Sequence, residues 1–349
     1  MWSRRAWLAS GSALAGGLLA AGAFGQVLPD EPRQRARLVL AVEDRRAFCY
    51  LPLTVAERLG HFSAQGLDIQ WREMADPGQA SQLVLSGAAQ VMSVPFSAAI
   101  ALNARGHRVQ SIVVQGRAPQ LVLGVSVRTL GHFRDWRDLR GKRIAIPAVG
   151  SGPHRMTRLL LARAGVHTAQ EVQFVALPDH GEAARAFRAG QVDALCHTDP
   201  LMTQLEQEGV LRVVADTRTR RGSDEVFGGP LPAGCLCVTE DFARTHPGVC
   251  QALADAMVLA LKWLQTAGPS DVIKVVPESY FRGDRALYLA AFARAREAWT
   301  PDGLMPERGP LVAARLQAQF DDSGLLQRVP LDRTYTNEFA RRAKQRFRA

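Results

Sequence analysis

The sequence lacks the residue patterns that mark many common functional classes. Its 349 residues include five cysteines, an odd number without regular spacing, which does not make a disulfide framework. It contains no G-x-S-x-G motif, no phosphate-binding loop, no dinucleotide fingerprint and no H-E-x-x-H pair. The net charge of +10 is spread over single Arg residues that do not alternate with aromatics, so we expect no nucleic-acid partner. These absences argue against a familiar type of enzyme, and we expect no cofactor and no metal.

Long hydrophobic runs are also absent, except near the N-terminus. Arg4 and Arg5 precede an uncharged stretch of small residues that extends to Ala23, which is typical of a twin-arginine export signal. The stretch is short and glycine-rich for a membrane span. We therefore expect residues 1–25 to be a signal peptide, with an uncleaved anchor as the alternative. The mature protein is expected to be a monomer in the periplasm.

The rest of the chain contains two alternations of strand-like and helix-like segments. The strands of the first are expected at residues 37–42, 67–74, 89–94 and 109–115, and those of the second at 142–149, 172–177, 192–196 and 211–215. Such alternation predicts an α/β protein with mostly parallel sheets and helices on both faces. We expect two α/β lobes joined by two crossings, followed by a helical C-terminal tail that packs back on the first lobe.

Two further β-like segments, Leu121–Val127 and Cys235–Thr239, lie at the borders of the second alternation and are expected to carry the chain between the lobes. Lobe 1 is then formed by residues 37–122 together with 238–349, and lobe 2 by residues 123–237. The segment Arg218–Gly234 is charged, rich in glycine and proline, and without periodicity, so it is expected to be a long surface loop. Tail helices are expected at about 247–267, 285–299, 311–319 and 337–348.

The most informative stretch is Leu139–Gly165, which predicts a strand, a glycine-rich loop and a helix. Ser151 can cap the helix, and Pro153 suits its first turn, where the missing N–H costs nothing. The free backbone N–H groups at such a helix start suit a small anion or a carbonyl-bearing ligand. A tight turn without a ligand is the alternative for this loop.

Open α/β sheets bind ligands beyond the carboxyl ends of their strands. Tyr50 lies in such a loop, and its hydroxyl needs a hydrogen-bond partner, so we expect it to contact the ligand. Ser93, Ser151 and Thr198 offer hydroxyl groups at equivalent positions. Asp199 precedes Pro200 at a helix start, so capping is its first expected role and ligand contact its second.

Three histidines, His154, His180 and His197, each follow a different strand of lobe 2. Their spacing matches no metal-ligand motif, so we prefer polar lining of a cleft, or ordinary loop histidines, to a metal or acid–base site. A histidine beside an anion tends to be protonated, and His154 and His180 are therefore candidates for binding an anionic ligand. A metal-dependent enzyme that uses the three histidines is the alternative from a different class.

Four stretches, in this order and spacing, resemble the nitrate/sulfonate/taurine-type periplasmic solute-binding proteins of ABC transporters. They are PLTVAERLGHF…QGLDI from Pro52, GAAQVMS from Gly87, LRGKRIAIP from Leu139, and GQVDA…DP from Gly190. The resemblance covers nearly all of the mature chain and is weakest beyond Asp271. It implies a type II binding-protein fold whose two hinged lobes close on a small solute and hand it to a permease in the inner membrane.

The resemblance also implies ligand contacts, at Cys49 and Tyr50, at Ser93 and Pro95, at Ser151 and Gly152, and at Thr198 and Asp199. Pro153 departs from the pattern because it removes an N–H group at the helix start. Cys49, His154 and His197 are not expected in a nitrate or taurine pocket, so the ligand can differ; a sulfonate-like or taurine-like compound, a nitrate-like ion or an aromatic carboxylate are all open. The same fold family includes pyrimidine-precursor (thiamine-type) binding proteins, and a sensor ectodomain is a further alternative.

Overall fold

The computed structural model describes residues 35–74, 78–321 and 323–349, so the predicted signal peptide, residues 1–25, lies outside the described residues. Within them the strands form two five-stranded sheets. The first has the order β2 (Leu67–Glu73), β1 (Ala36–Val42), β3 (Val91–Pro95), β10 (Gly234–Thr239), β4 (Val109–Val114). The second has the order β7 (Gln173–Ala176), β6 (Arg143–Ile146), β8 (Ala194–His197), β5 (Val122–Ser126), β9 (Leu211–Asp216).

Each sheet contains one antiparallel strand, which is β10 in the first sheet and β5 in the second. The other recorded pairings, β1 with β2 and β3, and β6 with β7 and β8, are parallel. The predicted fold, two mostly parallel sheets with helices, is therefore confirmed. The two segments expected as crossings are themselves these antiparallel strands, and the lobe boundary expected between residues 237 and 238 falls inside β10.

The antiparallel strands both begin at the carboxyl edge of their own sheet. Gly234, the first residue of β10, pairs with Pro95, the last residue of β3. Val122, the first residue of β5, pairs with His197, the last residue of β8. The chain therefore passes between the sheets at their carboxyl edges, through residues 115–121 and 217–233. This is the edge from which the loops of an α/β sheet bind ligands.

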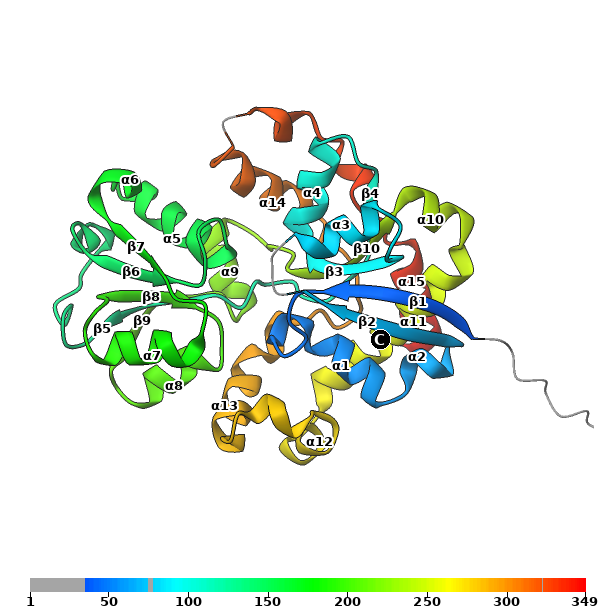
Figure 1. Cartoon of the computed structure of the whole chain (residues 1–349), viewed down its shortest axis with the longest axis horizontal. Helices are drawn as coiled ribbons and strands as arrows, with labels where there is room; N and C mark the ends of the chain where they lie inside the picture. The colour runs from blue at the N-terminus through cyan, green and yellow to red at the C-terminus, as the bar shows by residue number, and fades with distance from the viewer. Residues whose placement is uncertain (1–34, 75–77, 322) are drawn as a thin grey trace, which may run out of the picture. The chain divides into compact units, whose positions relative to one another are not determined.

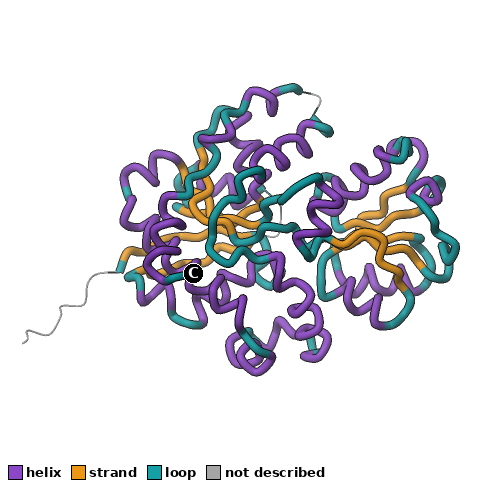
Figure 2. Tube along the Cα trace, turned by 180° about the vertical axis from the view of Figure 1, so that it is seen from behind, coloured by secondary structure: helices purple, strands orange, loops and turns teal. Residues whose placement is uncertain are grey.

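Helices cover both faces of each sheet (Figure 1). Alternate residues of β1 serve the two faces: Leu38, Leu40 and Val42 pack in one hydrophobic cluster and Ala41 in another. Figure 2 shows the same layering from behind, with strands enclosed by helices. The helices are α1 (Leu51–Arg58), α2 (His61–Ala64), α3 (Gln79–Leu85), α4 (Phe96–Ala104), α5 (Gly152–Arg163), α6 (Thr168–Glu171), α7 (His180–Arg188), α8 (Leu201–Gln207), α9 (Arg220–Phe227), α10 (Glu240–Thr245), α11 (Pro247–Thr266), α12 (Pro269–Val275), α13 (Arg285–Ala295), α14 (Gly309–Ala318) and α15 (Glu338–Phe347).

The prediction of a surface loop at Arg218–Gly234 is wrong, because helix α9 occupies much of it. Thr219 caps this helix by accepting a hydrogen bond from the Gly222 N–H at 3.1 Å. Only Ser223 and Val226 are buried in α9, so its apolar face is too small to give a visible periodicity in the sequence.

The C-terminal helices pack on the first sheet. Trp299 is fully buried there, and its Nε1–H donates to the Phe48 carbonyl at 2.8 Å. This bond ties the tail to the loop after β1, across 251 residues of sequence. No helix among the described residues combines the length and the apolar character needed to cross a membrane.

Candidate ligand-binding site

The loop after β1 brings Glu43, Cys49 and Tyr50 together in the first lobe. Burial raises the pKa of the Glu43 carboxyl, and no ion pair or hydrogen bond of this carboxyl occurs within the described residues. Burial raises the pKa of the Cys49 thiol to about 12, and the negative charges of Glu43 and Asp44 add to this effect. Tyr50 is 3% exposed, and burial, followed by the nearby Cys49 and Glu43, raises its pKa. Cys49 is therefore a protonated thiol, and the Glu43 carboxyl lacks a partner within the described residues.

Strand β3 places Ser93 and Pro95 beside the first crossing. Ser93 is fully buried, and its Oγ accepts a hydrogen bond from Gln115 Nε2 at 2.7 Å. Gln115 follows β4 at the start of the crossing and donates its backbone N–H to the Gly234 carbonyl at 2.7 Å. Pro95 is exposed at the end of β3. Ser93 thus holds the crossing in place, whereas Pro95 is open to the surroundings.

The glycine-rich loop before α5 satisfies most of its own N–H groups. Gly150 has a φ of +82°, which favours glycine, and its N–H donates to His154 Nδ1 at 2.9 Å. Ser151 caps the helix by accepting from the His154 N–H at 3.4 Å, and its own N–H donates to the Ala148 carbonyl. Pro153 has no N–H group. Gly152, which is exposed, therefore offers an N–H without a partner in the described residues, whereas the N–H groups of Gly150, Ser151 and His154 are already used, so the row expected from the sequence is interrupted.

His180 and His197 lie side by side in the second lobe. His180 begins α7, which follows β7, and His197 is the last residue of β8. Their ring centroids are 4.6 Å apart and the rings are nearly perpendicular. Burial, together with the charge of Arg282, lowers the pKa of His180 to about 4. Burial and the neighbouring His180 lower the pKa of His197 to about 3. Both imidazoles are therefore neutral near pH 7. His154 lies apart from them, edge-on to Phe174 at 4.6 Å, and burial followed by Arg158 and Arg155 lowers its pKa.

Charged residues of the first lobe lie close to this histidine pair. Asp44, Arg46 and Arg282 all contribute to the pKa of His180. Arg282 also lowers the pKa of Asp179, after the hydrogen bond that Asp179 accepts from the Glu182 N–H. The loops of the two lobes are thus near enough for their charges to interact. Arg282 is exposed, has a φ of +49°, and lowers the pKa of both His180 and Asp179.

Asp199 and Thr198 have internal partners. The Thr198 N–H donates to His197 Nδ1 at 2.9 Å. Asp199 Oδ1 accepts from the backbone N–H of Thr203 at 2.9 Å and from its hydroxyl at 2.8 Å. Asp199 Oδ2 lies 3.2 Å from Nη1 of the buried Arg218, which also pairs with Asp216. The carboxylate therefore supports the start of α8, in agreement with its first expected role, and balances the charge of Arg218.

Sequence reasoning did not single out Glu43, Arg282 or Arg218. Glu43 directly follows β1, so the rule that ligands bind beyond strand ends selects its position. Arg282 and Arg218 carry no local signal, because their roles come from the elements packed around them. Ligand contact by the residues chosen from the sequence stays a prediction.

The described residues contain no group of three His, Cys, Asp or Glu side chains placed to hold a metal ion. His154 and His197 each accept a backbone N–H at Nδ1, which leaves the proton on Nε2 in the neutral ring. A nitrogen that carries a proton cannot ligate a metal.

All five cysteines are free thiols, although the Sγ atoms of Cys235 and Cys237 lie 3.4 Å apart in β10.

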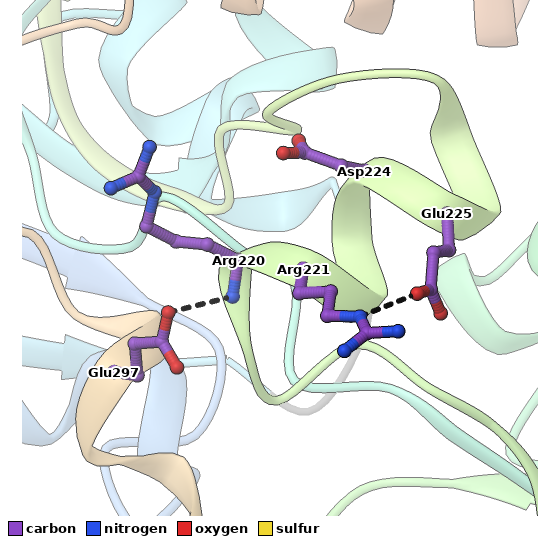
Figure 3. A pocket seen from close by; sticks show the side chains of 5 residues that line it. All are labelled: Arg220, Arg221, Asp224, Glu225 and Glu297. Atoms are coloured by element: carbon purple, nitrogen blue, oxygen red, sulfur yellow. Dashed lines mark hydrogen bonds and ion pairs between the residues drawn. The ribbon is translucent and has the colours of Figure 1, made fainter.

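Two cavities lie beside α9 rather than at the loops described above. One, of about 530 Å³, is lined by Arg220, Arg221, Asp224, Glu225 and Glu297 (Figure 3). In it Arg221 Nε bonds Glu225 at 2.8 Å, and the Arg220 N–H bonds Glu297 at 3.2 Å. The other, of about 400 Å³, adjoins it and is lined mainly by residues 300–306. Arg221 with Glu225 is the one ion pair between side chains that line these cavities in the described residues, and both cavities lie away from the loops at the carboxyl edges.

Two mostly parallel sheets, crossed twice at their carboxyl edges, define the fold of the periplasmic solute-binding proteins. The chain belongs to the NMT1-like family, whose model matches residues 46–276. A solved structure from Bordetella bronchiseptica RB50 is 36% identical, with a TM-score of 0.81 over 90% of this chain and 99% of that chain. The alkanesulfonate-binding protein SsuA from Xanthomonas axonopodis pv. citri is 19% identical, with a TM-score of 0.62 over 87% and 99%. The nitrate-binding protein NrtA from Synechocystis PCC 6803 is 13% identical, with a TM-score of 0.65 over 90% and 89%.

Proposed function

We propose that the chain is the extracytoplasmic solute-binding component of an ABC importer. It is exported by the twin-arginine route, binds a small organic anion between its lobes as a monomer, and delivers it to a permease in the inner membrane. The observation that carries this proposal is the arrangement of the two crossings. Because both join carboxyl edges, hydrogen-bond donors of lobe 2 and polar groups of lobe 1 border the same opening, and lobe closure can enclose a ligand there.

The chemistry of the two halves favours an anion that also carries an amino group. Lobe 2 offers the Gly152 N–H and two neutral histidines, and Arg282 adds a positive charge. Lobe 1 offers the unpaired carboxyl of Glu43. An ammonium group beside Glu43 would favour its ionised form. SsuA from Xanthomonas axonopodis was solved with MOPS, which is itself a sulfonate that carries an amine. An aminosulfonate of taurine type therefore fits better than nitrate alone.

A ligand screen tests the proposal directly. The mature chain is mixed with taurine, butanesulfonate, nitrate, benzoate and an aminopyrimidine, and thermal stability and intrinsic Trp fluorescence are recorded. We expect saturable binding of a sulfonate, a raised melting temperature and no conversion of the ligand by mass spectrometry. Chemical turnover of a probe would contradict the proposal, as would the absence of binding by every anion. Preference for the aminopyrimidine would instead support a pyrimidine-precursor binding protein.

A metal-dependent enzyme finds no support from the histidines. His154 is separate from the pair formed by His180 and His197. His197 Nδ1 accepts the Thr198 N–H, so Nε2 carries the proton and has no lone pair for a metal ion. Metal analysis of the purified chain before and after chelation is the direct check. Stoichiometric zinc, copper or iron whose removal destabilises the chain would favour the enzyme.

A further inference from the structure

The pair formed by His180 and His197 contains two buried ring nitrogens without a partner in the part of the chain that the structure describes. They are Nδ1 of His180 and Nε2 of His197. His197 is only 3% exposed, so water reaches little of its ring. A buried polar atom that lacks a hydrogen bond costs stability, which is why native proteins satisfy nearly all such atoms. Two adjacent exceptions at a strand end indicate that a further group completes them.

The backbone determines which kind of group can bind His197. Its Nδ1 accepts the Thr198 N–H at 2.9 Å and therefore holds a lone pair, so the proton of the neutral ring is on Nε2. Nε2–H is a donor, and it needs an acceptor. A cation or a metal ion is excluded as its partner, whereas an oxygen of a sulfonate, carboxylate or carbonyl group is suitable.

The groups around the pair agree with an acceptor that carries negative charge. The cations Arg282 and Arg46 come from lobe 1, while Asp44 from lobe 1 and Asp179 beside His180 are the facing acids. The Leu177 backbone, in the loop after β7, lies close enough to the His197 ring to raise its pKa. Arg282 has the largest single charge effect on His180, while Asp179 and Asp44 act in the opposite direction. Arg282 is therefore the group that can attract an oxygen anion to the pair, since neither imidazole is charged near pH 7.

We propose that His197 and His180 form a two-imidazole subsite in which His197 Nε2–H donates to an oxygen of the anionic head of the ligand. This deepens the proposed function, on which it rests, by naming the atoms of lobe 2 that recognise the head group. His180 packs edge-on against His197 and orients its ring, and its Nδ1 is available to a second polar atom of the same head group. Burial keeps the donors neutral, so recognition depends on hydrogen bonding and on Arg282 for charge.

The test compares three variants of the mature chain with the wild type. His197→Phe keeps a planar ring but removes the donor, and His197→Gln restores an N–H donor. His107→Gln is the matched control, because His107 is exposed. Dissociation constants for taurine, butanesulfonate and benzoate are measured by calorimetry, and the fold of each variant is verified by its unfolding curve. We expect His197→Phe to weaken binding of the bound probe at least tenfold, His197→Gln to recover part of the loss, and His107→Gln to change nothing.

A second measurement does not depend on any variant being stable. Nitrogen-15 NMR of the wild-type imidazoles should show the His197 proton on Nε2, with a shift of that resonance when the probe binds. Normal affinity in His197→Phe, or a proton on Nδ1, would overturn the subsite while leaving the binding function intact. Failure of these three probes and of nitrate to bind the wild type would instead overturn the proposed anion-binding function, and the subsite with it.

Discussion

The buried guanidinium of Arg218 provides the sharpest test of how lobe 2 is held together. Its side chain is 4% exposed and pairs with Asp216 at 2.6 Å and with Asp199, itself 2% exposed, at 3.2 Å. Replacing Arg218 with Met leaves Asp199 buried without a counter-charge, and breaking a buried pair in this way costs about 3–5 kcal/mol. In Asp199→Asn, the amide oxygen still accepts hydrogen bonds from Thr203, and Arg218 still pairs with Asp216. The free energy of unfolding should therefore fall by about 1–3 kcal/mol.

Urea unfolding followed by Trp fluorescence measures both changes. Arg221→Met is the matched control, since Arg221 pairs with Glu225 at the surface, where both side chains are well exposed and the pair contributes at most about 1 kcal/mol. The double variant that combines Arg218→Met with Asp199→Asn should lose less stability than the sum of the two single variants, because the Asp199 charge that Arg218→Met leaves unpaired is no longer present. If Arg218→Met were no more destabilising than Arg221→Met, the assignment of Arg218 as an internal support would be refuted.

Three further outcomes follow from burial and close packing. His197 has a pKa of about 3 in the folded chain against an ordinary value of 6.5, so between these pH values the unfolded chain binds one proton more than the folded chain. The free energy of unfolding should therefore fall by about 1.4 kcal/mol for each unit of decreasing pH because of this group. Urea unfolding curves of His197→Phe, measured over the same pH range, should lack that contribution. Gly222→Ala should cost about 2 kcal/mol or more, because its Cβ would lie 1.8 Å from the Asp216 carbonyl oxygen, whereas Gly248→Ala, with open space around it, should stay within about 1 kcal/mol in the same unfolding assay. Burial raises the pKa of Cys49 to about 12, and the other four thiols are buried. A thiol reagent at pH 8 should therefore label the native chain slowly, and should label all five cysteines only after denaturation. Rapid labelling of Cys49 in the native chain would contradict this.

The order of the strands and of most helices could be predicted because these elements carry a local signal. Tail helix α11 matches its predicted range to within one residue, since Pro247 marks its start and a long apolar face follows. Helix α9 could not be predicted, because its stability comes from the Thr219 cap and from packing by two small or medium side chains. The 3-10 turn at Arg296–Ala298 likewise ends α13 earlier than the periodicity suggests.

For the site, the sequence determined which loops follow strands, and hence that Tyr50, Ser151, His180 and Thr198 occupy the carboxyl edges. It did so because hydrophobic periodicity and turn residues act over a few positions. Only the tertiary structure decided which of their atoms are already used: the Gly150 N–H by His154, the Thr198 N–H by His197, and the Asp199 carboxylate by Arg218. Hydrogen bonds and ion pairs depend on distances between atoms that can be far apart along the chain, and those distances exist only after the sheets, helices and crossings have packed.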